Sequence, residues 1–204
     1  PFQMVDMAPF YDALPFTLTD AQRRCVEEAI ADMASGAPMN RLCQGDVGSG
    51  KTMVAAACVY FCVKNGRQAA LMAPTEILAR QHFTGLAPLL EKLGIRCVLL
   101  TGSTPAREKK AVTAKLAAGE ADFAIGTHAL ISQGVDYQNL GLVVTDEQHR
   151  FGVGQRAALA AKGSHPHTLV MSATPIPRTL ALILYGDLDV SIIDQLPPGR
   201  QPVQ

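Results

Sequence analysis

"RLCQGDVGSGKTMVAAACVYF", residues 41–61, carries the clearest structural signal of the chain. Its apolar start has the character of a buried strand, and it ends in a long helix-forming run. Between them, Gly45 to Thr52 match the pattern G-x-x-x-x-G-K-[S/T] in full. Glycines let successive backbone N–H groups turn inward around an anion, and the following helix adds the positive end of its dipole. The stretch therefore predicts a strand, a phosphate-binding loop and a helix, the start of a P-loop α/β domain.

The loop also predicts how a nucleotide triphosphate is held. Lys51 would reach the β- and γ-phosphates, and the hydroxyl of Thr52 would ligate Mg²⁺. The alternative is a glycine-rich turn between strand and helix that binds no ligand. The residues predicted to contact the nucleotide here are Gly45, Asp46, Gly48, Ser49, Gly50, Lys51 and Thr52.

Short β-type runs alternate with helical stretches along the rest of the chain. The spacing of Ala21, Cys25, Ala29, Ile30 and Met33, for example, predicts an amphipathic helix. Such alternation favours βαβ crossovers, so we expect an α/β fold of three layers, with a mostly parallel sheet and helices on both faces. The predicted strands are residues 41–45, 69–73, 96–101, 122–127, 142–146 and 168–172.

Two adjacent carboxylates, Asp146 and Glu147, follow the apolar run "LVVT". Ligands of parallel sheets bind beyond the carboxyl ends of the strands, and nucleotide-bound Mg²⁺ needs hard oxygen ligands. We therefore interpret Asp146 as the partner of the metal and Glu147 as the group that orients and deprotonates the attacking water. The alternative is a solvated acidic turn.

Two weaker features lie outside these motifs. Thr19-x-x-Gln22 matches a capping box at a helix start, and the physics alone supports only that reading. Ser172 and Thr174 follow the last predicted strand, where their hydroxyls could hydrogen-bond the acidic cluster. The alternative for this pair is a strand-end turn stopped by Pro175.

Composition narrows the class of protein. The 204 residues can form one good-sized domain with a real core. The longest uncharged apolar stretch lies between Lys51 and Lys64, short of the ~20 residues that a bilayer requires, so we expect no membrane partner. Five cysteines without a CxxC pair fit a reducing, cytoplasmic location. The 18 basic and 18 acidic residues cancel, so bulk charge would not hold a nucleic acid.

Taken in order, these motifs resemble those of the first RecA-like motor domain of superfamily 2 helicases. They run from the Gln22 region through "GDVGSGKT", "APTEILARQH", "LLTGS", "IGTHALI" and "DEQH" to "SATP". The segments "DEQHRFGVGQR", "MSATPIPRTLAL" and "LYGDLDVSIIDQLPPGR" are similar to the RecG type of this superfamily, ATP-dependent DNA helicases that remodel stalled replication forks. The resemblance implies the nucleotide-binding half of a DNA helicase or translocase, with ATP and Mg²⁺ as cofactors and branched or forked DNA as partner.

The resemblance also implies roles for single residues. Phe16 and Gln22 match the motif that contacts the adenine. His149 matches the position that links the γ-phosphate to DNA-dependent movement. The implied catalytic residues are thus Lys51, Asp146, Glu147 and His149, and the implied metal ligands are Thr52 and Asp146.

Further motifs match family elements that touch DNA or couple hydrolysis to motion. The residues that match contacts to the DNA backbone are Thr75, Arg80, Gly102, Ser103, Thr127 and His128. The residues that match coupling elements are Arg150, Phe151, Gln155, Arg156, Ser172 and Thr174. For the loop from Arg150 to Arg156, the alternative is a surface turn with a packed phenylalanine.

The predicted organisation is an N-terminal lead-in (1–15), a RecA-like motor domain (16–193) and the start of a linker (194–204). A full protein of this kind has an upstream wedge domain and a second RecA-like domain with the arginine finger. We expect both to lie outside these 204 residues, and the isolated chain to be nearly inactive. A transcription-repair-coupling-factor-like translocase, a nucleotide-dependent binding module without strand-moving activity, and an RNA remodeller stay open as alternatives.

Overall fold

The computed structural model describes residues 2–45, 50–146, 158–163, 166–172 and 189–193. Within these ranges the chain forms a seven-stranded sheet of order β3-β4-β2-β5-β6-β1-β7, and its pairings are all parallel. The strands are β1 (Asn40–Gly45), β2 (Gln68–Met72), β3 (Cys97–Leu100), β4 (Phe123–Gly126), β5 (Leu140–Asp146), β6 (His167–Ser172) and β7 (Asp189–Ile193).

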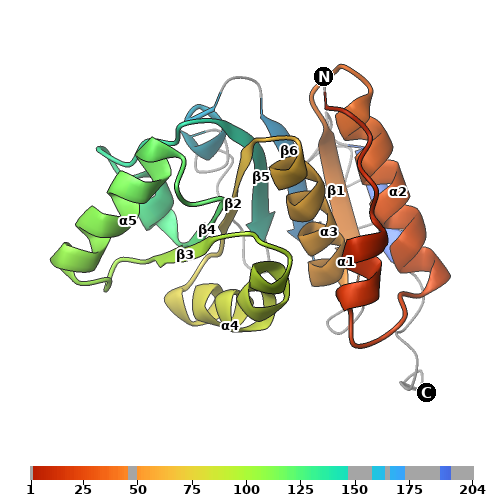
Figure 1. Ribbon diagram of the computed structural model, residues 1–204, viewed down its shortest axis with the longest axis horizontal. Coiled ribbons are helices and arrows are strands. Elements are labelled where there is room, and N and C mark those ends of the chain that lie inside the picture. The colour runs from red at the N-terminus through yellow and green to blue at the C-terminus, as the bar shows by residue number, and fades with distance from the viewer. Residues whose placement is uncertain (1, 46–49, 147–157, 164–165, 173–188, 194–204) are drawn as a thin grey trace.

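Helices cover both faces of this sheet (Figure 1). Successive residues of a strand point to opposite faces. In β2, Ala69 and Leu71 therefore pack into the core under α2, α3 and α4, whereas Ala70 and Met72 pack into the core under α5 and η1. The predicted three-layer α/β architecture is confirmed. The helices are α1 (Ala8–Ala13), α2 (Asp20–Ala34), α3 (Lys51–Lys64), α4 (Glu76–Lys92), α5 (Ala106–Ala118) and the 3₁₀ helix η1 (His128–Ile131).

All six predicted strands are present, with boundaries that differ by at most two residues. The seventh strand, β7, was not predicted. It pairs with β1 at one end of the described sheet, and Val190 and Ile192 are 39% and 52% exposed. Because β7 is short, carries an aspartate at its start and is only partly buried, it lacks the continuous apolar run that marks the inner strands.

Helix α3 forms the centre of the larger core. Every residue from Val54 to Cys62 is buried, because the helix lies against α2 on one side and the sheet on the other. This is the uncharged stretch between Lys51 and Lys64, and burial within the protein accounts for its composition. Within the described ranges, no helix combines the length and apolarity needed to cross a membrane.

The N-terminal segment packs on the same core. Phe10 of α1 is fully buried, with its ring centroid 5.9 Å from that of Tyr60 in α3. Phe2 stacks edge-on against His167 at 4.6 Å. The predicted division at residue 16 remains a prediction, but the lead-in contributes side chains to the interior of the domain.

Candidate active site

The carboxyl ends of the parallel strands form one edge of the sheet, to which the arrowhead of β5 points in Figure 1. Along this edge, the predicted DNA-contacting residues follow β3, β4 and β2. The predicted phosphate-binding residues follow β1, the predicted acids end and follow β5, and the predicted coupling residues Ser172 and Thr174 end and follow β6. The sheet therefore separates the two predicted sets into neighbouring halves of one edge.

The phosphate loop and the first acid lie at this edge with one strand between them. In β6, Met171 pairs with Asp146 of β5, and Ser172 pairs with Gln44 of β1. Neighbouring strands are about 4.8 Å apart, so the ends of β1 and β5 are separated by about 10 Å. This places Gly45 and Asp146 on the same side of the sheet, as a site for one metal-bound triphosphate requires.

The described part of the phosphate loop has the expected local structure. Gly45 ends β1, and Lys51 and Thr52 open α3. Lys51 is 8% exposed, so most of its stem is buried while it stands in the first turn of the helix. Asp46, Gly48 and Ser49 lie outside the described residues.

Gly50 shows why glycine is needed before the helix. It adopts φ +84°, a left-handed conformation that other residues rarely take. A Cβ built on it would come within 1.8 Å of Nε2 of Gln22. The absence of that Cβ makes room for the Gln22 amide, which lies against the backbone of Gly50.

Gln22 also forms the predicted capping box. Its backbone N–H donates to Oγ1 of Thr19 at 3.1 Å, and the Thr19 N–H donates to Oε1 of Gln22 at 2.8 Å. Capping uses Oε1, while Nε2 faces Gly50, so the capping role and the implied adenine contact are compatible. Phe16, the second residue implied for the adenine, is 42% exposed.

Asp146 is deeply buried. It ends β5 with 1% exposure, and its Oδ2 accepts a hydrogen bond from Nε2 of His82 at 2.7 Å. Its other oxygen, Oδ1, is buried and has no hydrogen-bond partner within the described ranges. A buried carboxylate oxygen without a donor is costly, so Oδ1 calls for a partner such as a cation or a metal-bound water.

These features fit a magnesium–nucleotide site. Mg²⁺ is usually held by one or two carboxylates together with substrate phosphates, not by a cage of protein ligands. Consistent with this, no cluster of three or more metal-ligating side chains occurs in the described part of the chain. Oδ1 of Asp146 would hold the cation, and the loop between β1 and α3 would hold the phosphates.

Of the predicted coupling residues, only Ser172 lies within the described ranges. Ser172 ends β6 and is 2% exposed, between the ends of β1 and β5. Its coupling role remains a prediction. Besides Asp46, Gly48 and Ser49, the predicted residues that lie outside the described ranges are Glu147, His149, Arg150, Phe151, Gln155, Arg156 and Thr174.

The half of the edge predicted to face DNA is organised by a carboxylate that the sequence did not single out. Oε1 of Glu76 accepts hydrogen bonds from Thr101 at 3.1 Å, from Nη2 of Arg80 at 3.0 Å and from the hydroxyl of Ser103. Ser103, and after it Arg80, lower the pKa of the Glu76 carboxyl. Glu76 thereby ties the loop that follows β3, including Gly102, to the start of α4.

The remaining predicted DNA contacts lie beside this cluster. Thr75 caps α4 by accepting from the N–H of Leu78 at 3.2 Å. Thr127 follows β4, the strand between β2 and β3, and its hydroxyl accepts from the N–H of Ala129 in η1. Thr127 is buried and His128 is exposed. The six predicted residues thus lie in the loops and helix starts that follow three neighbouring strands.

His82 is the second residue that the sequence did not single out. On α4 it lies three residues after Ala79 and four before Leu86, both fully buried. Residues with this spacing share one helix face, so His82 points toward the sheet. The sequence offered one signal, which is a histidine among apolar residues at helical spacing. It did not show that this histidine bonds to Asp146 at the end of a strand.

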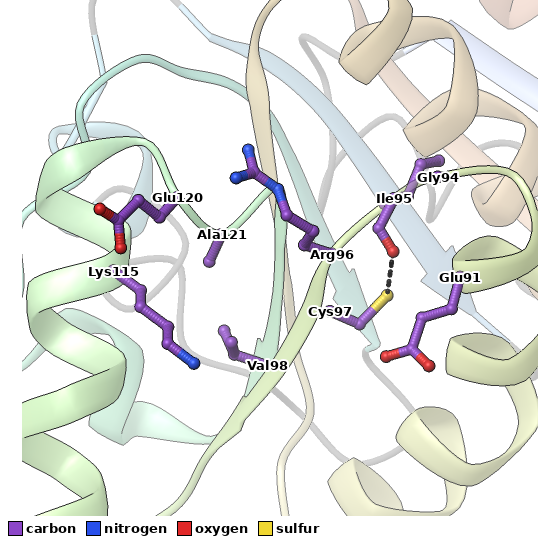
Figure 2. A pocket seen from close by; sticks show the side chains of 9 residues that line it. All are labelled: Glu91, Gly94, Ile95, Arg96, Cys97, Val98, Lys115, Glu120 and Ala121. Atoms are coloured by element: carbon purple, nitrogen blue, oxygen red, sulfur yellow. Dashed lines mark hydrogen bonds between the residues drawn. The ribbon is translucent and has the colours of Figure 1, made fainter.

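A separate pocket lies at the opposite edge of the sheet, where β3 begins (Figure 2). Arg96 stands at its rim, donating to both carboxylate oxygens of Asp122 at 2.9–3.0 Å and to the carbonyl of Gly119 at 2.9 Å. The Cys97 thiol donates to the carbonyl of Ile95, as the dashed line in Figure 2 marks. None of the predicted site residues lines this pocket.

Comparison with known proteins gives the class of the chain. A model of the DEAD/DEAH box helicase family matches residues 19–183. The chain belongs to this family. Within it, the predicted likeness to the RecG type is confirmed by the relatives. The ATP-dependent DNA helicase RecG of Synechocystis sp. is 57% identical over 194 residues, which cover 95% of this chain and 23% of the relative.

Further relatives agree. RecG of Bacillus subtilis is 52% identical over 203 residues, covering 100% of this chain and 30% of the relative. The chain thus spans less than a third of the length of these relatives. A solved structure of RecG bound to a three-way DNA junction matches with a TM-score of 0.88 and 48% identity, over 100% of this chain and 28% of that one. The helicase MrfA bound to DNA matches at 20% identity with a TM-score of 0.68, which shows the fold alone.

Proposed function

We propose that the chain is the nucleotide-binding half of a RecG-type, ATP-dependent DNA helicase that remodels branched DNA. One observation carries the proposal: the phosphate loop and the buried Asp146 stand about 10 Å apart at the same edge of the sheet, on either side of one strand. Oδ1 of Asp146, which no described donor satisfies, supports a cation between them.

In this proposal, the residues at the nucleotide-binding half of the edge have separate roles. The N–H groups of the loop and Lys51 bind the phosphates, and Thr52 and Asp146 hold the magnesium ion. Phe16 and Gln22 contact the adenine. Glu147 deprotonates the attacking water. His149 links the γ-phosphate to DNA-dependent movement. When bound, the cation neutralises charge on the β- and γ-phosphates.

The other half of the edge would bind DNA. The proximity of Thr75, Arg80 and Ser103 around Glu76 supports a common surface for the phosphate backbone. We also propose a branched substrate, an upstream wedge domain and a second RecA-like domain, because the relatives are RecG helicases and one solved RecG is bound to a three-way DNA junction.

The test is single-turnover ATP hydrolysis by the full-length protein in the presence of forked DNA. We expect Glu147→Gln to bind Mg·ATP normally but to hydrolyse it at least ~10²-fold more slowly, because the general base is lost. Glu91→Gln is the matched control, since Glu91 is exposed and lines the pocket at the opposite edge. A wild-type protein that binds nucleotide without hydrolysing it would favour the binding-module alternative. Equal stimulation by single-stranded RNA would favour the RNA remodeller.

A further inference from the structure

Helix α4 and the end of β5 meet in one buried polar contact. His82 Nε2 and Asp146 Oδ2 are 2.7 Å apart, and the two side chains are 12% and 1% exposed. A carboxylate only accepts hydrogen bonds, so Nε2 carries the proton and donates it. The contact joins residues 64 positions apart in the chain.

This contact fixes the carboxylate of Asp146. A hydrogen bond to Oδ2 selects one orientation of the group about its Cβ–Cγ bond, and that orientation leaves Oδ1 as the oxygen without a described partner. Ligating carboxylates are commonly held in this way by an outer partner, whose removal weakens metal binding. His82 occupies the place of such a partner.

The same helix presents its opposite side to the other half of the edge. Arg80 and His82 are two residues apart, which is about 200° around an α-helix, so they lie on opposite faces. Arg80 has a side-chain exposure of 55% and bonds to Glu76, while His82 points inward beside Ala79 and Leu86. Ala79, Leu86 and Leu90 are fully buried, so α4 packs against the core along the same face as His82.

We propose that His82 is a positioning residue for Asp146 and that it transmits the position of α4, which carries Thr75 and Arg80, to the magnesium site. A shift of α4 caused by DNA at Arg80 would move the donor of Asp146 and thereby alter how well Oδ1 receives the cation. The inference rests on the proposed function, because it takes Asp146 as a metal-binding acid. It adds the element that connects the two halves of the edge.

The competing explanation is that the hydrogen bond between His82 and Asp146 only stabilises the fold. Two variants of His82, one that keeps an N–H donor and one that lacks it, separate the two explanations. His82→Gln retains an N–H donor at nearly the reach of Nε2, whereas His82→Met has similar length and no donor. Thr84→Ala is the control, because Thr84 is an exposed residue on the same helix. Thermal unfolding of each variant shows that it is folded.

The measurement is the affinity of the full-length protein for a fluorescent, non-hydrolysable ATP analogue at increasing Mg²⁺ concentration. We expect His82→Met to raise the Mg²⁺ concentration at half-saturation about 10-fold. His82→Gln should stay within about 3-fold of wild type, and Thr84→Ala should match it. The affinity without Mg²⁺ should be the same in all four proteins. Equal Mg²⁺ requirements in folded His82→Met and wild type would overturn the positioning role.

A second series adds saturating forked DNA. We expect DNA to change the Mg²⁺ requirement of the wild type and of His82→Gln, and to leave that of His82→Met nearly unchanged. A response that His82→Met shares with the wild type would overturn the transmission through α4 alone. A wild-type protein that shows no Mg²⁺-dependent nucleotide binding would instead overturn the proposed function, and the inference with it.

Discussion

The side-chain amide of Gln22 occupies the space that a Cβ on Gly50 would need: the two atoms would be 1.8 Å apart. The start of α2 and the phosphate loop are therefore fitted to each other through the absence of a single methyl group. This relationship links a capping residue to the nucleotide site.

Gly50→Ala should weaken nucleotide binding. The substitution forces an L-residue into φ +84° and displaces the Gln22 amide, so we expect a loss of at least ~10-fold in affinity for an ATP analogue, measured by fluorescence titration. Gly66→Ala is the matched control, because Gly66 has φ +80° with open space around its Cα. Both variants should lose about 1 kcal/mol of stability, and only the first should lose nucleotide affinity.

Arg80→Ala should weaken DNA binding by the full-length protein. We expect a uniform loss across DNA sequences and a fall of about one in the slope of log affinity against log salt, since one phosphate contact disappears. Arg96→Ala is the matched control, because both arginines pair with a carboxylate and are similarly exposed, Arg80 to 55% and Arg96 to 57%. Arg96 lies at the opposite edge, so its removal should leave the slope unchanged. An unchanged slope in Arg80→Ala would remove Arg80 from the DNA surface.

The stability of the domain should fall in mild acid because of His167. Burial, and after it the charge of Arg67, lower the pKa of His167 to about 4, and its Nδ1 accepts from the N–H of Met39 at 2.8 Å. The unfolded chain takes up this proton near pH 6.5. The contribution is therefore complete above pH 6.5 and is lost as the pH falls toward 4.

Between pH 7 and pH 5 this loss should reach about 1–2 kcal/mol, seen as a lower unfolding midpoint in thermal scans. His167→Asn should reduce the difference between the two pH values. His128→Asn, at an exposed histidine, should retain the difference in full. A pH dependence that is unaltered in His167→Asn would assign the effect to other groups.

The isolated chain should bind DNA weakly. Its 18 basic and 18 acidic residues cancel, so few counterions are released on binding, and we expect a dissociation constant above about 10⁻⁶ M at physiological salt. Fluorescence anisotropy with forked DNA measures this. Nanomolar binding would show that the Thr75–Arg80 surface holds DNA without the help of other domains.

Much of the architecture was predictable from the sequence because its signals are local. Strands β2, β4 and β5 are mostly apolar, since both faces of a parallel sheet are buried, and the glycine pattern predicts the strand before it and the helix after it. The edge that gathers the polar clusters followed from the parallel arrangement. Strand β7 was not predicted because three of its five residues are exposed and its pairing with β1 spans about 150 residues.

The contacts within the site were less accessible. Asp146 was identified because an acid directly after a buried strand is unusual. The bond from His82 to that acid was not, since it depends on how α4 crosses the end of β5. Glu76 was overlooked for a similar reason: its partners Thr101 and Ser103 belong to a loop that only the order β3-β4-β2 brings near.

The buried ring of Phe10 has a practical consequence for how this domain is cut from a longer chain. The recognisable motifs begin near Phe16, and a fragment trimmed to them would leave an empty hole beside Tyr60. Loss of a buried phenylalanine costs about 3–5 kcal/mol, a large share of what a domain of this size has to spare. A stable fragment of this domain must therefore include Phe10, upstream of the first recognisable motif.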